Sequence, residues 1–198
     1  MSPYNGCLPP REFVNKNDRE GFVSEVEVWI KERILIEYNE MEHGSIARYL
    51  PTMSVKQEKG EIVKVRPVLD YRDINKAVMS HPGGSLPLCG NQFRNWRQCG
   101  DKVAVLDLRK AYLQIQIDKT LWKHQAIKWK GKTFLLTRLG FGFCSAPKIM
   151  TKIVEFVIKN EPSLQNAVSS YIDDLYVDES KVQAHEVSRI FFRMGAGY

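Results

Sequence analysis

The sequence has little cysteine and no long apolar run. The spacing of Cys7, Cys89, Cys99 and Cys144 matches no zinc pattern such as C-x-x-C, and Cys144, in an apolar stretch, is expected to be buried. No segment approaches the roughly 20 apolar residues that cross a bilayer, and the N-terminal "MSPYNGCLPPREF" is too polar for a signal peptide. These absences predict an intracellular protein with no membrane partner; a cytoplasmic particle and the nucleus are not distinguished.

The composition is that of a globular protein with a basic surface. Of 198 residues, 43% are hydrophobic and 26% are charged, which favours a folded core over disorder. Lys and Arg outnumber Asp and Glu by 29 to 23, so the net charge is +6. A modest basic excess suits a nucleic-acid partner, although many basic proteins bind none. The chain ends abruptly after "VSRIFFRMGAGY", as a fragment of a longer protein or a truncated gene product would.

The first 50 residues are predicted to contain one amphipathic helix. Residues 1–16 read as an irregular arm, and apolar residues at 3.6-residue spacing then predict a helix over about 18–35. Asn17 or Asp18 is the expected N-cap of this helix. Residues 39–48 are polar, so a turn is expected there.

A β-hairpin is predicted next, in "YLPTMSVKQEKGEIVKVRPVLDYRDIN". Its two β-type runs flank "EKGE", which has the composition of a turn. Pro67 has no N–H to donate to a ladder, so its strand should lie at a sheet edge or be bulged. Asp70 and Arg72 are expected to form a structural ion pair and turn.

The rest of the chain alternates helices and strands without a regular βαβ rhythm, which predicts an α+β fold. The helix expected at 145–160 would be capped by Ser145, with an apolar stripe at Ile149, Ile153, Phe156 and Val157. The other expected elements are a loop at 81–85, a helix at 91–99, a buried strand at 102–108 followed by a turn or short helix, a hairpin turning at Lys130-Gly131, and a helix from about 180.

Adjacent acids interrupt a β-forming segment, "SSYIDDLYVDES". Asp173 and Asp174 would lie at a hairpin tip with both carboxylates able to point the same way. Adjacent like charges repel unless a cation neutralises them, and Mg²⁺ is commonly bound by carboxylates together with substrate phosphate oxygens. A solvated turn is the alternative for such a pair. Asp178 and Glu179, farther along, are expected to be ordinary surface charges.

A third carboxylate is available in "VAVLDLRKAY". Asp107 follows an apolar run, so it should end a buried strand, where a charge is costly without a partner. If that strand lies beside the hairpin, Asp107 joins Asp173 and Asp174, and the three could hold two metal ions for phosphoryl transfer. The alternative is that Asp107 caps the helical turn that follows.

Four stretches together resemble the reverse transcriptases. They are "VRPVLDYRDIN", "VAVLDLRKAYLQIQID", "LTRLGFGFCSAPKIM" and "YIDDLYVDES", and their order is that of the family. The resemblance covers about 25–190 and is most similar to the polymerase of LTR retrotransposons, of the gypsy-like or a related lineage. "YIDD" is a form of the family's Y-x-D-D box.

The resemblance implies the fingers and palm of a right-hand polymerase, with an antiparallel palm sheet packed on helices and the thumb absent. Fingers would occupy 1–82, with the N-terminal arm, and 115–144. The palm would occupy 83–114 and 145–198. Thumb and RNase H regions of a longer polyprotein are expected but absent here.

The resemblance also implies site residues. Asp107, Asp173 and Asp174 match the catalytic carboxylates, which bind two Mg²⁺ ions, with Mn²⁺ as a possible substitute. The matches for dNTP binding are Arg66, Tyr112, Phe141 and Gly142, with one of Lys56, Lys59 and Lys64 as a partner, and those for nucleic-acid contact are Tyr171 and Pro147. From the residues alone, Tyr112 could equally be a core aromatic and Arg66 a solvated strand charge. Phe143 and the tryptophans Trp96, Trp122 and Trp129 are expected to serve packing.

The implied function is RNA-directed DNA polymerisation, a nucleotidyltransferase reaction. The partners would be an RNA or DNA template with its primer, and dNTPs. The alternative is a catalytically inactive, polymerase-derived fragment that binds nucleic acid or a protein partner.

Overall fold

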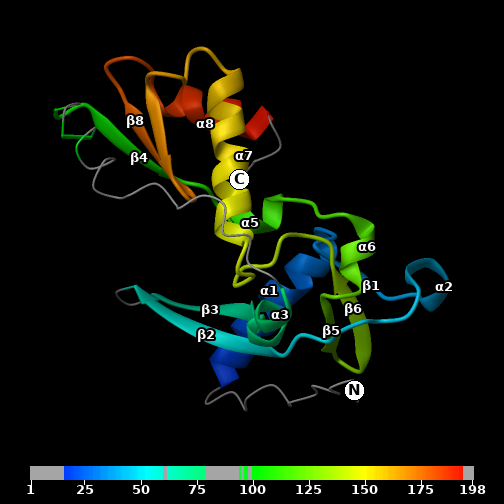
Figure 1. Ribbon diagram of the computed structural model, residues 1–198. Coiled ribbons are helices and arrows are strands. Elements are labelled where there is room, and N and C mark those ends of the chain that lie inside the picture. Colours follow the sequence, from blue (N-terminus) through cyan, green and yellow to red (C-terminus); the bar gives the residue numbers. More distant parts are fainter. Residues whose placement is uncertain (1–15, 60–61, 79–93, 95, 98–99, 194–198) are drawn as a thin grey trace. The chain divides into compact units, whose positions relative to one another are not determined.

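The computed structural model describes residues 16–59, 62–78, 94, 96–97 and 100–193 (Figure 1). The expected N-terminal arm, the loop at 81–85 and most of the helix at 91–99 lie outside these residues. Two compact units are present: residues 1–78 with 116–143, and residues 79–115 with 144–198. Their assignment to fingers and palm stays a prediction.

The first unit begins with helix α1, Lys16–Lys31, in place of the predicted 18–35. Phe22, Val26 and Trp29 form its buried face, as their spacing predicts. The prediction that the helix continues to residue 35 is wrong. The chain turns at Arg33, whose φ is +57°, and Leu35–Glu37 forms strand β1, because it finds hydrogen-bond partners in β6.

Strands β5, Ala126–Trp129, and β6, Lys132–Leu136, form the predicted hairpin. Lys130 and Gly131 both have positive φ, +47° and +77°, which is the backbone of a tight two-residue hairpin turn. β1 adds to β6, so the sheet order is β1-β6-β5. The expected turn at 39–48 contains a short helix instead, α2, Glu40–His43, because the Asn39 side chain accepts a capping bond from the Met41 N–H at 3.0 Å. A second short helix, α6, covers Lys119–Trp122.

The hairpin predicted in "YLPTMSVKQEKGEIVKVRPVLDYRDIN" is also present. Among the described residues, strands β2, Thr52–Lys59, and β3, Ile62–Leu69, pair only with each other, so both are edge strands and Pro67 loses no ladder bond to a third strand. The edge prediction for Pro67 is therefore confirmed. Asp70 accepts bonds from the Nε of Arg72 at 2.9 and 3.0 Å, which confirms the predicted ion pair at the start of helix α3, Arg72–Ala77.

A buried tyrosine organises the interior of this unit. The Tyr71 hydroxyl donates to Oε1 of Gln125, and Nε2 of Gln125 donates to the carbonyls of Leu136 and Arg138 at 3.4 and 3.3 Å. Burial raises the pKa of Tyr71 far above its ordinary value, so it stays a neutral donor. Gly140 lies directly against the ring and hydroxyl of Tyr71.

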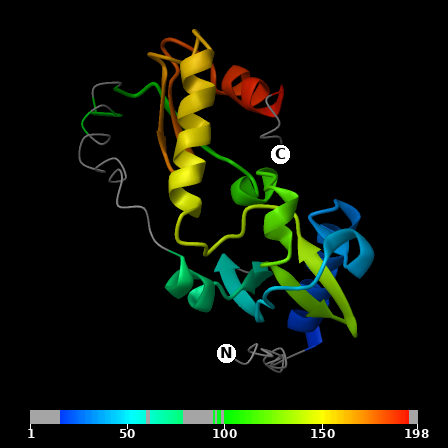
Figure 2. The same ribbon diagram turned by 45° about the vertical axis from the view of Figure 1, so that its right-hand side comes forward.

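The second unit is a three-stranded antiparallel sheet covered by helices on one face. Its strands are β4, Val103–Asp107; β7, Val168–Tyr171; and β8, Asp174–Asp178, in the order β4-β8-β7. Helix α7, Ala146–Asn160, lies along the sheet, and α8, Ala184–Arg193, lies beside it (Figures 1 and 2). Leu175 and Val177 of the central strand are fully buried. The short helix α5, Ala111–Gln114, follows β4.

Four expectations for this unit need correction. α7 begins after Ser145, as predicted, but the Ser145 side chain makes no capping hydrogen bond. Of the four residues predicted for its apolar stripe only Val157 is buried, and Met150 and Val154 complete the buried face, whereas Phe156 is 65% exposed. The other predicted positions lie on the adjacent face of the helix, which is also apolar. Cys144 is exposed rather than buried, since its apolar neighbours belong to the loop before α7. The last helix begins at 184 instead of about 180.

Within the described ranges, no helix is long and apolar enough to cross a membrane.

We predict that Gly140→Ala destabilises the protein by about 1–3 kcal/mol, because the new methyl group overlaps Tyr71 and forces the buried ring to move. Urea denaturation followed by circular dichroism would measure the change. The matched control is Gly21→Ala in α1, where the methyl group would meet only Val65 at an ordinary 3.5 Å. That change should stabilise the helix by about 0.5–1 kcal/mol. Equal stability of Gly140→Ala and the wild type would contradict the packing argument.

Candidate active site

Two of the three predicted carboxylates meet through strand pairing. Asp107 is the last residue of β4 and Asp174 is the first of β8, and the register places them directly opposite each other. Directly opposed residues on antiparallel strands have Cβ atoms about 4.5–5.5 Å apart and point to the same face. The sheet therefore sets these carboxylates side by side.

The third carboxylate lies in the adjoining turn. Tyr171 pairs with Asp174, so Ile172 and Asp173 are the two residues of the hairpin turn. The N–H of Leu108, just after β4, donates to the carbonyl of Asp173 at 3.3 Å. This bond ties the turn to the end of β4, beside Asp107.

The turn carries backbone strain. Ile172 has a φ of +60°, in the left-handed region that β-branched residues avoid. Such a conformation costs on the order of 1–3 kcal/mol and persists only where surrounding structure imposes it. The pairing of β7 with β8 on one side, and the Leu108 bond on the other, impose it here.

The electrostatics show that the carboxylates interact. Burial raises the pKa of Asp174, and the negative charges of Asp173 and Asp107 raise it further. Tyr112 of α5 is only 9% exposed, and its pKa is raised by burial and then by Asp173. The three acids and the Tyr112 ring therefore belong to one neighbourhood at one end of the sheet.

The expectation that β4 is a buried strand is wrong. Val105 is 58% exposed and Asp107 is exposed, because α7 and α8 pack against the opposite face of the sheet. Asp107 is not a buried charge, so the need to compensate for burial does not explain its place beside the other acids. Strand register places it beside the other acids.

A metal site made of protein side chains alone is not preformed. In the described part of the chain, no group of three or more His, Cys, Asp or Glu side chains could hold a metal ion. The donor set is nevertheless all oxygen and mutually repulsive, which is the chemistry that hard divalent cations relieve.

Two further predicted residues belong to the same unit. Tyr171 ends β7 opposite Asp174 and is half-buried. Pro147 lies in the first turn of α7 and is also half-buried. Their contact with nucleic acid stays a prediction.

The remaining predicted residues lie in the first unit. Arg66 is exposed on β3 opposite Val55. Phe141 is 62% exposed, and Gly142 has a φ of +100°, a conformation that favours glycine, while its carbonyl accepts a 2.8 Å bond from Asn75. Because the carboxylates belong to the second unit, a joint role for the two groups stays a prediction.

The lysine expected to partner Arg66 and the aromatics expected to pack can be placed only in part. Lys56 is exposed on β2, whereas the side chains of Lys59 and Lys64 lie outside the described residues. Phe143 is half-buried and its ring lies 6.1 Å from that of Tyr71, which confirms the packing role expected for it.

Asp178 is a buried charge that the sequence does not predict. Expected to be a surface charge, it is only 7% exposed, because the salt bridge from Lys181 at 2.8 Å and the Ser180 hydroxyl fold the chain over it. The Lys181 bond, then the Ser180 bond, lowers the pKa of Asp178 to about 2. The Asp178-x-x-Lys181 spacing is the one feature of the sequence that could have indicated the salt bridge between these two residues.

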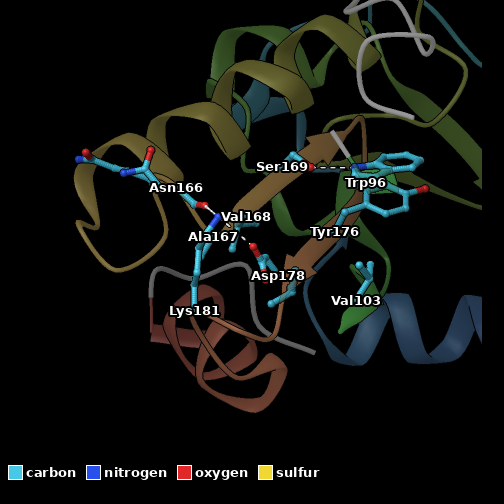
Figure 3. A pocket seen from close by; sticks show the side chains of 11 residues that line it. Trp96, Val103, Asn166, Ala167, Val168, Ser169, Tyr176, Asp178 and Lys181 are labelled. Carbon is cyan, nitrogen blue, oxygen red and sulfur yellow. Dashed lines mark hydrogen bonds and ion pairs between the residues drawn. The ribbon is translucent and has the colours of Figure 1, made fainter. Parts of the chain in front are cut away.

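Trp96, which the sequence predicts to serve packing, has two specific partners in the structure. Its ring stacks on Tyr176, and its indole N–H donates to the Ser169 hydroxyl at 2.9 Å (Figure 3). A pocket of about 560 Å³ lies beside these residues and extends to Asp178 and Lys181 (Figure 3).

Comparison with known proteins agrees with this geometry. The profile of the family described as Reverse transcriptase (RNA-dependent DNA polymerase) matches residues 56–194. The Pro-Pol polyprotein of Simian foamy virus type 1 is 27% identical to the chain over 208 residues, covering all of the chain and 17% of the polyprotein. The chain thus spans about a sixth of that relative.

Solved structures show the same fold. The protease-reverse transcriptase of prototype foamy virus, as a selenomethionine-labelled mutant, has a TM-score of 0.67 at 24% identity, covering 100% of this chain and 26% of that one. A foamy viral protease-reverse transcriptase in complex with dsDNA has a TM-score of 0.65 at 24% identity, covering 100% of this chain and 40% of that one. The fold is therefore that of a reverse-transcriptase polymerase, with mixed helices and antiparallel sheets.

The chain belongs to the reverse transcriptase (RNA-dependent DNA polymerase) family. Its relatives place it with the retroviral or LTR type. The gypsy-like lineage stays a prediction.

We predict that Asp174→Asn raises stability at pH 7 by about 0.5 kcal/mol, because it removes repulsion between opposed carboxylates. The folded-state pKa of Asp174 is raised above 3.8, so its ionised form destabilises the fold only at higher pH. The gain should therefore vanish as pH falls below that value. Thermal unfolding between pH 3 and pH 8 would measure it.

The matched control is Asp178→Asn at the other end of β8. Its folded-state pKa is lowered to about 2, so its charge stabilises the fold above pH 3.8, and this contribution is lost as pH falls through about 2. Asp178→Asn should therefore lower the melting temperature at pH 7. Two asparagine variants that shift stability in the same direction would contradict this electrostatic assignment.

Proposed function

We propose that this chain is the fingers and palm of an RNA-directed DNA polymerase from a retrotransposon or retroviral polyprotein. It would extend a primer 3′-OH with dNTPs. The observation that carries the proposal is the register that opposes Asp107 and Asp174 beside Asp173. A sheet that sets like charges together on an otherwise well-packed scaffold needs a cationic partner there.

The two units supply the proposed subdomains. The first, built on the hairpins β2-β3 and β5-β6, would form the fingers, and the second, which carries the acids, would form the palm. In this proposal the fingers cover 1–82 and 115–144, and the palm covers 83–114 and 145–198. Thumb and RNase H regions would come from the longer protein that the size of the relatives suggests.

The carboxylates would hold two Mg²⁺ ions, with Mn²⁺ as a substitute. Mg²⁺ is usually held by one or two carboxylates plus substrate phosphates and water. Asp107, Asp173 and Asp174, which do not form a complete metal site by themselves, would therefore supply one half of the coordination. When bound, the ions would activate the primer hydroxyl and neutralise charge on the transferring phosphate. Asp107 and Asp174 would hold them from the strands, and Asp173 from the turn.

Other residues would position the substrates. The Tyr112 ring, held by burial beside Asp173, would pack under the deoxyribose and exclude a 2′-OH. Arg66, which is exposed on β3, would hold phosphate oxygens with its forked guanidinium. Phe141 and Gly142 would contact the incoming nucleotide.

Nucleic acid is the proposed macromolecular partner. A related structure contains dsDNA, and this chain has a net charge of +6. Tyr171 beside the acids, and Pro147 at the start of α7, would contact the primer-template. Binding through Lys and Arg should weaken as salt rises.

We predict that Asp107→Asn, Asp173→Asn or Asp174→Asn each lowers primer extension roughly a thousandfold, equivalent to about 4 kcal/mol of transition-state stabilisation. Extension of oligo(dT) on poly(rA) with dTTP and Mg²⁺ or Mn²⁺ measures this. The control is Asp73→Asn, an exposed acid paired with Lys76 in the other unit, which should extend normally. Wild-type synthesis no greater than that of the three variants would favour a catalytically inactive fragment.

We predict that Tyr112→Ala raises ribonucleotide incorporation relative to deoxyribonucleotide by about tenfold or more, because the cavity that it leaves admits a 2′-OH. Competition between dTTP and UTP on the same template measures the ratio. Tyr112→Phe keeps the ring and should keep the discrimination. A ratio unchanged by Tyr112→Ala would leave Tyr112 as a core aromatic only.

A further inference from the structure

The open face of the palm-like sheet carries a contact that joins its two hairpin strands. Tyr176 lies two residues after Asp174 on β8, and Ser169 lies two residues before Tyr171 on β7. Side chains two apart on a strand share a face. Tyr176 and Ser169, which are register partners, therefore lie on the face that carries Asp107 and Asp174.

Trp96 bridges this pair. Its ring lies 3.3 Å from that of Tyr176, centroid to centroid, at an interplanar angle of 21°, and its indole N–H donates to Ser169 Oγ at 2.9 Å (Figure 3). One side chain thus contacts β8 by stacking and β7 by a hydrogen bond. Both contacts lie two residues, or roughly 7 Å, from the strand ends at Tyr171 and Asp174 that flank the turn.

The hairpin tip needs such a constraint. Asp173 and Asp174 repel each other and Asp107, and Ile172 is held at positive φ, so both effects favour opening of the turn. The opposite face is held by Leu175 and Val177, which are buried in the core. On the acid-bearing face, Val105 is 58% exposed, so core burial does not provide the same restraint.

We propose that Trp96 is a positioning residue for the metal-binding carboxylates. By joining β7 to β8 on the acid-bearing face, it fixes the spacing of Asp173 and Asp174 that a divalent cation requires. The proposal rests on the proposed function, because it assigns Trp96 a role at the same site. Residues that orient ligands from outside the coordination sphere typically change metal affinity about tenfold or more when they are removed.

Mn²⁺ binding to the full chain, measured by electron paramagnetic resonance, tests this without requiring turnover. Trp96→Ala removes both contacts and should weaken binding on the order of tenfold. Ser169→Ala removes only the hydrogen bond, and Trp96→Phe also loses it but keeps a ring that can stack on Tyr176. Each variant should therefore weaken Mn²⁺ binding about threefold, which is within the contribution of one neutral hydrogen bond. Phe156→Ala, an exposed aromatic of α7 in the same unit, should bind like the wild type.

The results separate the two proposals. If wild type binds no Mn²⁺ more tightly than Asp173→Asn, the carboxylate site itself is wrong. If wild type binds and all Trp96 and Ser169 variants bind equally well, only the role of Trp96 is overturned. Thermal unfolding shows whether Trp96→Ala is misfolded. If it is, weaker Mn²⁺ binding by Ser169→Ala and Trp96→Phe supports the role of Trp96, and unchanged binding by both overturns it. In primer extension, the variants that bind Mn²⁺ more weakly should need a higher half-saturating Mg²⁺ concentration, with an unchanged KM for dTTP.

Discussion

The antiparallel pairing of β4 with β8 sets Asp107 against Asp174, and the arrangement of the second unit depends on that register. Like charges directly opposite each other cost about 0.2–1 kcal/mol. The same strand, β8, buries Leu175 and Val177 completely, and each contributes about 1.5–3 kcal/mol. The free energy gained by burying Leu175 and Val177 on one face of β8 thus exceeds the cost of carboxylate repulsion on the other face. A one-residue slip would reverse both faces at once, so the apolar face fixes where the carboxylates lie.

The sequence was sufficient wherever local chemistry decides the structure. Lys130-Gly131 has the turn residues that a two-residue hairpin needs, and the edge position of Pro67 follows from its missing N–H. The α+β class and the hairpin that carries the acids followed from the same kind of pattern. Of the candidate site, the meeting of Asp107 with the hairpin was predictable only as a hypothesis, because strand pairing is a long-range choice.

The sequence was insufficient wherever a tertiary partner decides. β4 has the apolar residues of a buried strand, yet Val105 is exposed, since α7 and α8 pack against the other face of its sheet. α7 carries apolar residues on two adjacent faces, so periodicity could not show which one is buried. Asp178 is buried because Lys181 and Ser180 fold over it, which a composition-based expectation of surface charge does not capture. Leu35 leaves the helical pattern because β6 offers it a strand partner.

The interactions that destabilise the hairpin lie at its tip, and those that stabilise it lie along its strands. Ile172 at positive φ and three interacting carboxylates would each be relieved if the turn relaxed. The Leu108 bond to Asp173, the buried central strand and the Trp96 bridge oppose that relaxation from three directions. The strands therefore hold the carboxylates together although their charges repel. In the proposed function, a divalent ion would gain affinity by relieving this repulsion rather than by ordering a flexible loop.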